Sequence, residues 1–176
     1  MNLKDIAKDQ TLANLLSDGN WRQADFYDLD SKDRNSGRTL IVALNKSVTS
    51  NAKGTLLYLI QKQTKALGIW EREWGNTAPS VKEFVDFFIA EKGVSNASGK
   101  ILKAEGVLEN IRKHLQDLQN ADGFECSKNG VTTTFQNFLT EEKIMQVVGF
   151  DNEWNEQNLF VEMENVWVLY HWSLGI

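Results

Sequence analysis

The chain has little cysteine, histidine or proline, and each shortage excludes a class of protein. Its single cysteine, Cys126, rules out an intrachain disulfide. That thiol and the two histidines, His114 and His171, are too few for a cysteine- and histidine-based zinc site. We therefore expect no metal, no other cofactor and a reducing compartment.

Long hydrophobic runs are also missing. The longest ones, Leu56–Ile60 and Val166–Tyr170, fall far short of the roughly 20 residues that span a bilayer. Residues 1–10 carry charges throughout and lack the apolar core of a signal peptide. We expect a cytoplasmic protein with no membrane partner. The 176 residues suit a single globular domain, 1–176, which is large enough to bury a core.

Apolar spacing predicts helices through most of the first two-thirds of the chain. The clearest begins at Ser80, which forms a capping-box pattern with Glu83 ahead of a regular apolar stripe. A hydrophobic period of 3.5 residues over 98–120 predicts a helix that packs nearly parallel to another one. This seam also allows a homodimer through helix 98–120. The predicted helices cover residues 3–17, 21–29, 56–67, 80–93 and 98–120.

Strand signals gather towards the C-terminus. Asn129-Gly130 predicts a type I′ hairpin turn, because both central residues of that turn need positive φ. Residues 140–149 carry the signals of a short helix, and residues 159–172 read as one long strand or as a hairpin bent at Glu164-Asn165. Only Thr39–Leu44 predicts a strand earlier in the chain. The expected class is therefore α+β, mainly helical in the N-terminal two-thirds, with a small antiparallel sheet formed by C-terminal strands.

Charge is segregated along the sequence. The net charge is −5, yet residues 34–70 contain six basic side chains and no acid. Residues 115–176 contain ten acids and two lysines. This layout indicates either two binding surfaces of opposite sign or two segments that pack together and neutralise each other.

The acidic, aromatic C-terminal third suggests a non-catalytic binding protein. Exposed acids speed encounter with a basic partner, and aromatic side chains supply anchors. The partner would be a basic protein surface, such as that of a nucleic-acid-binding protein, which an inhibitor or immunity protein masks. The residues predicted to make this contact are Glu153, Trp154, Glu156, Glu162 and Glu164.

The basic segment 34–70 supports an alternative function, that of a nucleic-acid-binding accessory protein. Tyr58, Lys62 and Lys65 share one face of a predicted helix. Lysines contact phosphates and aromatic rings stack on bases. Against this hypothesis, the sequence pI is about 5.1, whereas nucleic-acid-binding domains are usually basic.

An enzyme is the third reading, and it is less favoured than a binding protein. Glu162 and Glu164 could form an acid–base pair beside His171. No phosphate-binding loop supports a nucleotide-hydrolysing enzyme, because Lys53-Gly54-Thr55 has the wrong residue order for that motif.

Overall fold

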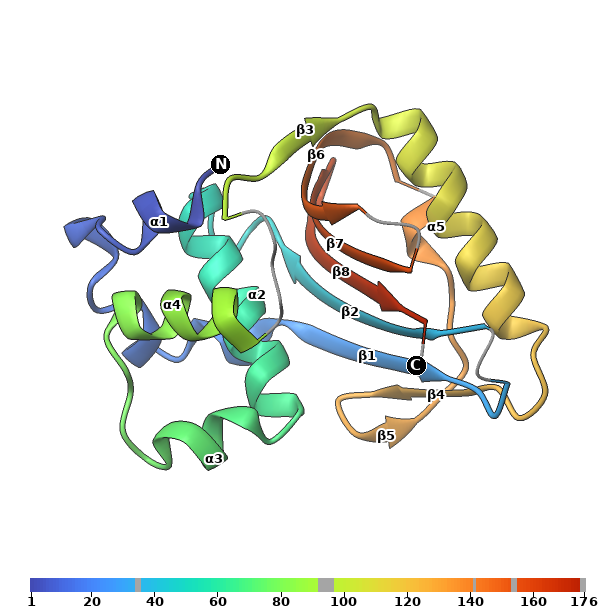
Figure 1. Ribbon diagram of the computed structural model, residues 1–176, viewed down its shortest axis with the longest axis horizontal. Helices are drawn as coiled ribbons and strands as arrows, with labels where there is room; N and C mark the ends of the chain where they lie inside the picture. Colours follow the sequence, from blue (N-terminus) through green and yellow to red (C-terminus); the bar gives the residue numbers. More distant parts are fainter. Residues whose placement is uncertain (34–35, 92–96, 141, 153–154, 175–176) are drawn as a thin grey trace.

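A single large antiparallel sheet organises the molecule. The computed structural model describes residues 1–33, 36–91, 97–140, 142–152 and 155–174. Eight strands run in the order β3-β6-β7-β8-β2-β1-β4-β5, and each neighbouring pair is antiparallel. Figure 1 shows α1 to α4 gathered on one side and α5 on the other.

The helices and strands follow one another along the whole chain. The helices are α1 (Leu3–Ile6), α2 (Ala52–Ala66), α3 (Ile69–Trp74), α4 (Val81–Glu91) and α5 (Ala104–Gln119), with 3₁₀ turns at Gln10–Leu12, Leu15–Ser17, Asn20–Gln23 and Phe138–Thr140. The strands are β1 (Asp25–Asp30), β2 (Arg38–Asn45), β3 (Lys100–Leu102), β4 (Glu125–Lys128), β5 (Val131–Thr132), β6 (Ile144–Asn152), β7 (Glu156–Met163) and β8 (Val166–Ser173).

The predicted division into a helical N-terminal two-thirds and a small C-terminal sheet is wrong. Strands β1, β2 and β3 come from the first two-thirds, and β2 pairs along its full length with β8 near the C-terminus. Helices and strands are thus interleaved in the sequence, and the sheet is the largest element of the fold rather than an appendage of it.

Two strands lie in segments whose local sequence predicted helices. Residues 21–29 were expected to be helical, but β1 takes up most of them, and its polar Asp28 is held by Arg38 of β2. Residues 140–149 were also expected to be helical, with Thr140 as the cap, Leu139 and Ile144 as a hydrophobic staple and Gly149 as the stop. Gly149 instead lies within β6, where a Cβ would come within 2.7 Å of the Leu102 side chain.

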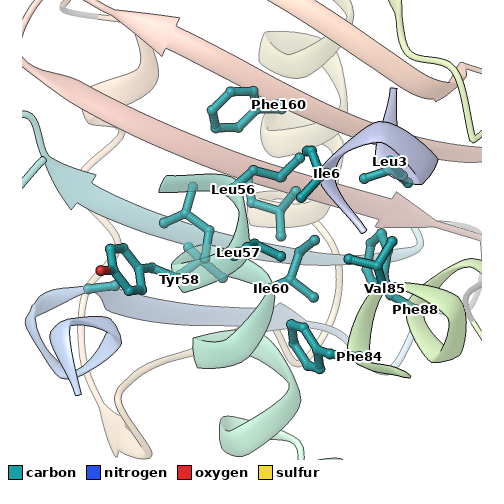
Figure 2. Packing of buried hydrophobic residues seen from close by; sticks show 14 of the residues in the cluster. Leu3, Ile6, Leu56, Leu57, Tyr58, Ile60, Phe84, Val85, Phe88 and Phe160 are labelled. Carbon is teal, nitrogen blue, oxygen red and sulfur yellow. The ribbon is translucent and has the colours of Figure 1, made fainter. Parts of the chain in front are cut away.

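The sheet separates two hydrophobic cores. Alternation along the strands sends Leu40 and Val42 of β2 to one face and Ile41 to the other. The first core lies under α1, α2 and α4, and Figure 2 shows residues such as Leu56 and Phe84 from these helices packed together with Phe160 of β7. The second core lies beneath α5. Both cores share one sheet, so they support each other.

Helix α2 runs through the middle of the first core. Nearly all its residues from Gly54 to Thr64 are buried, and Lys62 is the exception. The expected helix 56–67 is therefore present but begins earlier, at an Asn51 side chain that accepts hydrogen bonds from the backbone of Lys53 and Gly54. The two ends of α2 reach the surface, at Lys53 and at Lys62 and Lys65.

Helix α5 occupies most of the predicted helix 98–120 and begins six residues later. Residues 100–102 form β3 instead, and Ile101 is 71% exposed. The seam residues Ile111, Leu115 and Leu118 are buried in the second core. The apolar face that would have mediated a homodimer thus packs on the chain's own sheet, and the homodimer itself stays a prediction.

Several local predictions are confirmed. The Ser80 hydroxyl accepts from the Glu83 backbone N–H at 3.2 Å, and the Glu83 carboxylate accepts from the Ser80 N–H at 2.9 Å. Asn129 and Gly130 have φ of 51° and 81° between β4 and β5. Residues 159–172 form a hairpin. Within the described ranges, no helix is long and apolar enough to cross a membrane.

Candidate functional site

The basic segment 34–70 is largely neutralised within the fold. Arg38 pairs with Asp28, Lys46 with Glu162 at 2.7 Å, and Lys53 with Asp9 at 3.1 Å. Arg34 lies outside the described residues. The Lys46–Glu162 pair joins the basic stretch to the acidic stretch, as expected if the two segments pack together.

Lys62 and Lys65 are the remaining basic residues of this segment. Neither makes an ion pair within 4.0 Å among the residues that the structure describes. Both are half-buried near the end of α2, where the helix emerges from the first core. Two cations therefore lie close together without a direct ion pair among the described residues, although the charges of Asp25 and Glu71 act on them from further away.

Trp21 brings these lysines together. The Lys62 Nζ lies 5.8 Å from the centre of the Trp21 ring, and the Lys65 Nζ lies 5.0 Å from it. The guanidinium carbon of Arg22 lies 5.4 Å from the same ring, again without a described ion pair. We call Trp21, Arg22, Lys62 and Lys65 the Trp21 cluster. Lys65 also lies 4.0 Å from the ring centre of Trp70.

Burial and like charge both act on the lysines of the Trp21 cluster. Burial lowers the pKa of Lys62 below its ordinary value, although the charge of Asp25 opposes this. Burial is also the main cause that lowers the pKa of Lys65; the charge of Glu71 opposes this shift, and the nearby charge of Arg22 adds to it. The aromatic rings offset part of this cost through cation–π contact. A bound anion would offset more of it.

A hollow of about 410 Å³ opens beside the Trp21 cluster. Trp21, Phe26 and Ala66 form an apolar wall of this hollow. Lys62 and Lys65 of α2 also line it. The β4–β5 turn and the carboxylates of Asp28 and Glu71 complete the lining, so the hollow has two acids as well as two lysines. The volume lies within the range typical of small-molecule sites. The hollow can accept a ligand with an anionic group and a planar part.

Tyr58, the aromatic residue predicted to accompany the lysines, faces a different environment. It is only 5% exposed and belongs to the first core. Its hydroxyl donates to the Asp18 carboxylate and accepts from the Asn20 side chain at 3.3 Å. Burial and the Asp18 hydrogen bond raise its pKa. Tyr58 thus anchors the turn that precedes Trp21 and leaves the open ring surface to Trp21.

The predicted acidic docking residues lie apart. Glu156 begins β7 and accepts from Asn158, Glu162 lies near the other end of that strand, and Glu164 is exposed in the turn that follows. Glu162 is held by Lys46. Glu153 and Trp154 fall outside the described residues. Docking of a basic partner on these acids stays a prediction.

The enzyme hypothesis grouped residues that the hairpin keeps apart. His171 of β8 pairs with Asn158, whereas Glu162 is four residues further along β7, roughly 13 Å away at the usual rise of a strand. The His171 Nδ1 contacts the Asn158 Oδ1 at 2.8 Å, and the Asn158 amide donates to Asp151 and Glu156 at 3.2 Å each. Because carboxylates only accept, the Asn158 oxygen must face His171, whose Nδ1 carries the proton.

Cys126 and His114, the other candidate reactive groups, pack against other side chains of the fold. Cys126 is buried in the second core, and burial raises the pKa of its thiol, which makes it a weak nucleophile. The His114 ring stacks on Trp172 with centroids 3.8 Å apart. Among the described residues, no group of three or more histidine, cysteine or carboxylate side chains could hold a metal ion.

Sequence reasoning identified Lys62 and Lys65 but missed Trp21 and Arg22. The pair lies about 40 positions earlier in the chain, in a segment expected to be a helix. Its one visible signal was a tryptophan flanked by polar residues in Asn20-Trp21-Arg22, which is unusual for a core position. No protein-family model, curated protein or solved structure matches this chain.

Proposed function

We propose that the protein is a non-catalytic binding protein whose Trp21 cluster takes a phosphate-bearing ligand with a planar ring. The observation that carries this proposal is the meeting of three cations, Arg22, Lys62 and Lys65, at one half-buried indole ring. None of the three has an ion-pair partner among the described residues.

A bound anion would offset the free-energy cost of partly burying the charged lysines. Lysines that lose water without forming a direct ion pair are destabilised in their charged form, as the lowered pKa values of Lys62 and Lys65 indicate, and the charges of Asp25 and Glu71 offset only part of this cost. A bound anion restores favourable charge contacts. Part of the binding free energy would therefore come from removing this destabilisation of the unliganded site.

A phosphate group suits this cluster better than a carboxylate does. It presents three oxygens in a tetrahedral arrangement, so Lys62 and Lys65 can each donate to a different oxygen of one group. They stand at i and i+3 on α2, which places them on neighbouring positions of the helix surface. The indole of Trp21 offers a stacking partner for a base attached to that phosphate.

Calorimetric titration of thymidine monophosphate into the full chain tests the proposal. Lys62→Gln with Lys65→Gln removes both charges while keeping side chains of similar polarity, and should weaken binding at least tenfold. Lys53→Gln is the matched control, because Lys53 lies on the same helix but pairs with Asp9. It should bind like the wild type.

Two results would contradict the proposal. One is that the wild type binds no thymidine monophosphate at low salt. The other is that Lys53→Gln weakens binding as much as the double substitution, since the attraction would then come from overall charge and not from the cluster.

A further inference from the structure

A second hollow adjoins the first one at the Trp21 cluster. It has a volume of about 360 Å³ and is lined on one side by the turn around Gly19 and on another by α3. Three residues line both hollows: Trp21, Lys65 and Glu71. The two hollows therefore share a boundary formed by one aromatic ring, one cation and one carboxylate.

The cations are distributed over the two hollows in series. Lys62 lines only the first, Arg22 lines only the second, and Lys65 lines both. Each hollow also has an aromatic residue in its wall besides Trp21, namely Phe26 in the first and Trp70 in the second; both are largely buried in the first core, so Trp21 has the more open ring. A ligand chain in which charged links alternate with planar units would meet the three cations in this order.

The second hollow contains a buried acceptor that lacks a partner. Gln61 is fully buried and lines it, and its Nε2 donates to the Leu16 carbonyl at 2.8 Å. Its Oε1 has no hydrogen-bond partner among the described residues. Buried polar atoms are rarely left in that state. A ligand with a ring N–H, such as thymine or uracil, could supply the missing donor after a small side-chain movement.

We infer that the two hollows together bind two consecutive nucleotides of a single-stranded nucleic acid. This inference rests on the proposed function of the Trp21 cluster and extends it. The phosphate that links the two nucleotides lies at Lys65, with Lys62 on one side and Arg22 on the other. Stacking on aromatic side chains and contact with spaced cations are how proteins hold single strands.

The charge of the protein sets the length of the strand that it can hold. The net charge is −5, and the other described basic residues of segment 34–70, Arg38, Lys46 and Lys53, are already paired with acids. Longer strands should therefore gain little over a dinucleotide. This separates the site from the extended basic grooves of general single-strand-binding proteins.

The experiment compares three ligands by calorimetry on the full chain. These are thymidine monophosphate, a thymidine dinucleotide with a terminal phosphate, and inorganic tripolyphosphate. We expect the dinucleotide to bind about tenfold more tightly than the mononucleotide, since stacking of a second base adds roughly this much. Tripolyphosphate carries more charge but no base, and should bind more weakly than the dinucleotide.

Two single variants locate the nucleotides. Arg22→Gln should weaken the dinucleotide much more than the mononucleotide and so remove the gain of the dinucleotide, because Arg22 lines only the second hollow. Lys62→Gln should weaken both ligands, because Lys62 lines the first. A uridine dinucleotide titrated alongside separates RNA from DNA as the source, and tighter binding of either one supports the inference.

The outcomes distinguish the two proposals. If mononucleotide and dinucleotide bind equally, or if tripolyphosphate binds as tightly as the dinucleotide, the inference of a two-nucleotide site is wrong, while an anion-binding Trp21 cluster stands. If none of the ligands binds, both proposals are wrong. If Arg22→Gln leaves the gain intact, the second nucleotide does not occupy the second hollow.

Discussion

The Lys46 Nζ lies 2.7 Å from the Glu162 Oε1 and so connects the basic stretch of the sequence to the acidic one. Both side chains are about one-third exposed or less, and Lys46 also lies 4.7 Å from the Trp167 ring centre. Solvent screens such a pair only in part. The segregated charges of the sequence thus meet across the fold at this point.

The Lys46–Glu162 pair should contribute modestly to stability. We expect a coupling free energy of about 0.5–1 kcal/mol from a double-mutant cycle of Lys46→Ala and Glu162→Ala, measured by urea unfolding. The cycle is needed because Lys46→Ala also loses the contact with Trp167. Additive effects of the two substitutions would show that the pair contributes nothing.

His114 should make stability depend on pH. Burial lowers its pKa below the ordinary 6.5, although Asp117 opposes the shift. The unfolded chain therefore binds a proton more readily, so stability falls as the pH drops below about 6.5 and levels off below the folded pKa. His114→Phe keeps a ring against Trp172 and should reduce this loss between pH 7.5 and 5 in chemical unfolding. An unchanged pH profile in the variant would contradict the assignment.

The two cores should unfold together because they share one sheet. Leu59→Ala in the first core and Leu115→Ala in the second each remove a fully buried side chain. Each should cost about 2–5 kcal/mol. Far-ultraviolet circular dichroism and tryptophan fluorescence should report the same midpoint in both variants. Two separated transitions would show that the cores are independent units.

Replacing Gly99 and Gly106 with alanine should change the stability of the fold in opposite directions. A Cβ at Gly99 would lie 2.2 Å from a Val148 methyl and 2.9 Å from the Phe150 ring, so Gly99→Ala should destabilise the fold by about 1–3 kcal/mol. Gly106 lies within α5 with nothing within 4 Å of its Cβ position, so Gly106→Ala should stabilise by up to about 1 kcal/mol. Thermal unfolding measures both, and equal effects would contradict the packing described.

Local signals in the sequence predicted much of the fold. The Ser80–Glu83 box and the Asn129-Gly130 turn depend on a few adjacent residues and are confirmed. The missed strands depend on distant partners. β1 tolerates Asp28 because Arg38 lies across from it, and β6 tolerates Gly149 because Leu102 fills the space. Neither partner is visible in a window of a dozen residues.

The candidate site likewise combines residues that local sequence identified with residues that only the fold brings to them. Lys62 and Lys65 stand three positions apart on one helix, so spacing alone identified them. Trp21 reaches them only because Tyr58 and Gln61 of α2 hold the preceding turn through Asp18 and the Leu16 carbonyl. Which acids neutralise Arg38, Lys46 and Lys53 is likewise a property of the fold. The sequence therefore could not show that Arg38, Lys46 and Lys53 are paired while Lys62 and Lys65 are not.

The most direct test of the Trp21 cluster follows the indole N–H resonances of the six tryptophans by NMR during titration with thymidine monophosphate. Trp21→Phe assigns the resonance of Trp21. We predict that the Trp21 resonance shifts most, with Trp70 next because Lys65 contacts both rings, and that Trp167 beside Lys46 stays unchanged. A saturable shift centred on Trp167 or Trp172, with Trp21 unmoved, would contradict the account.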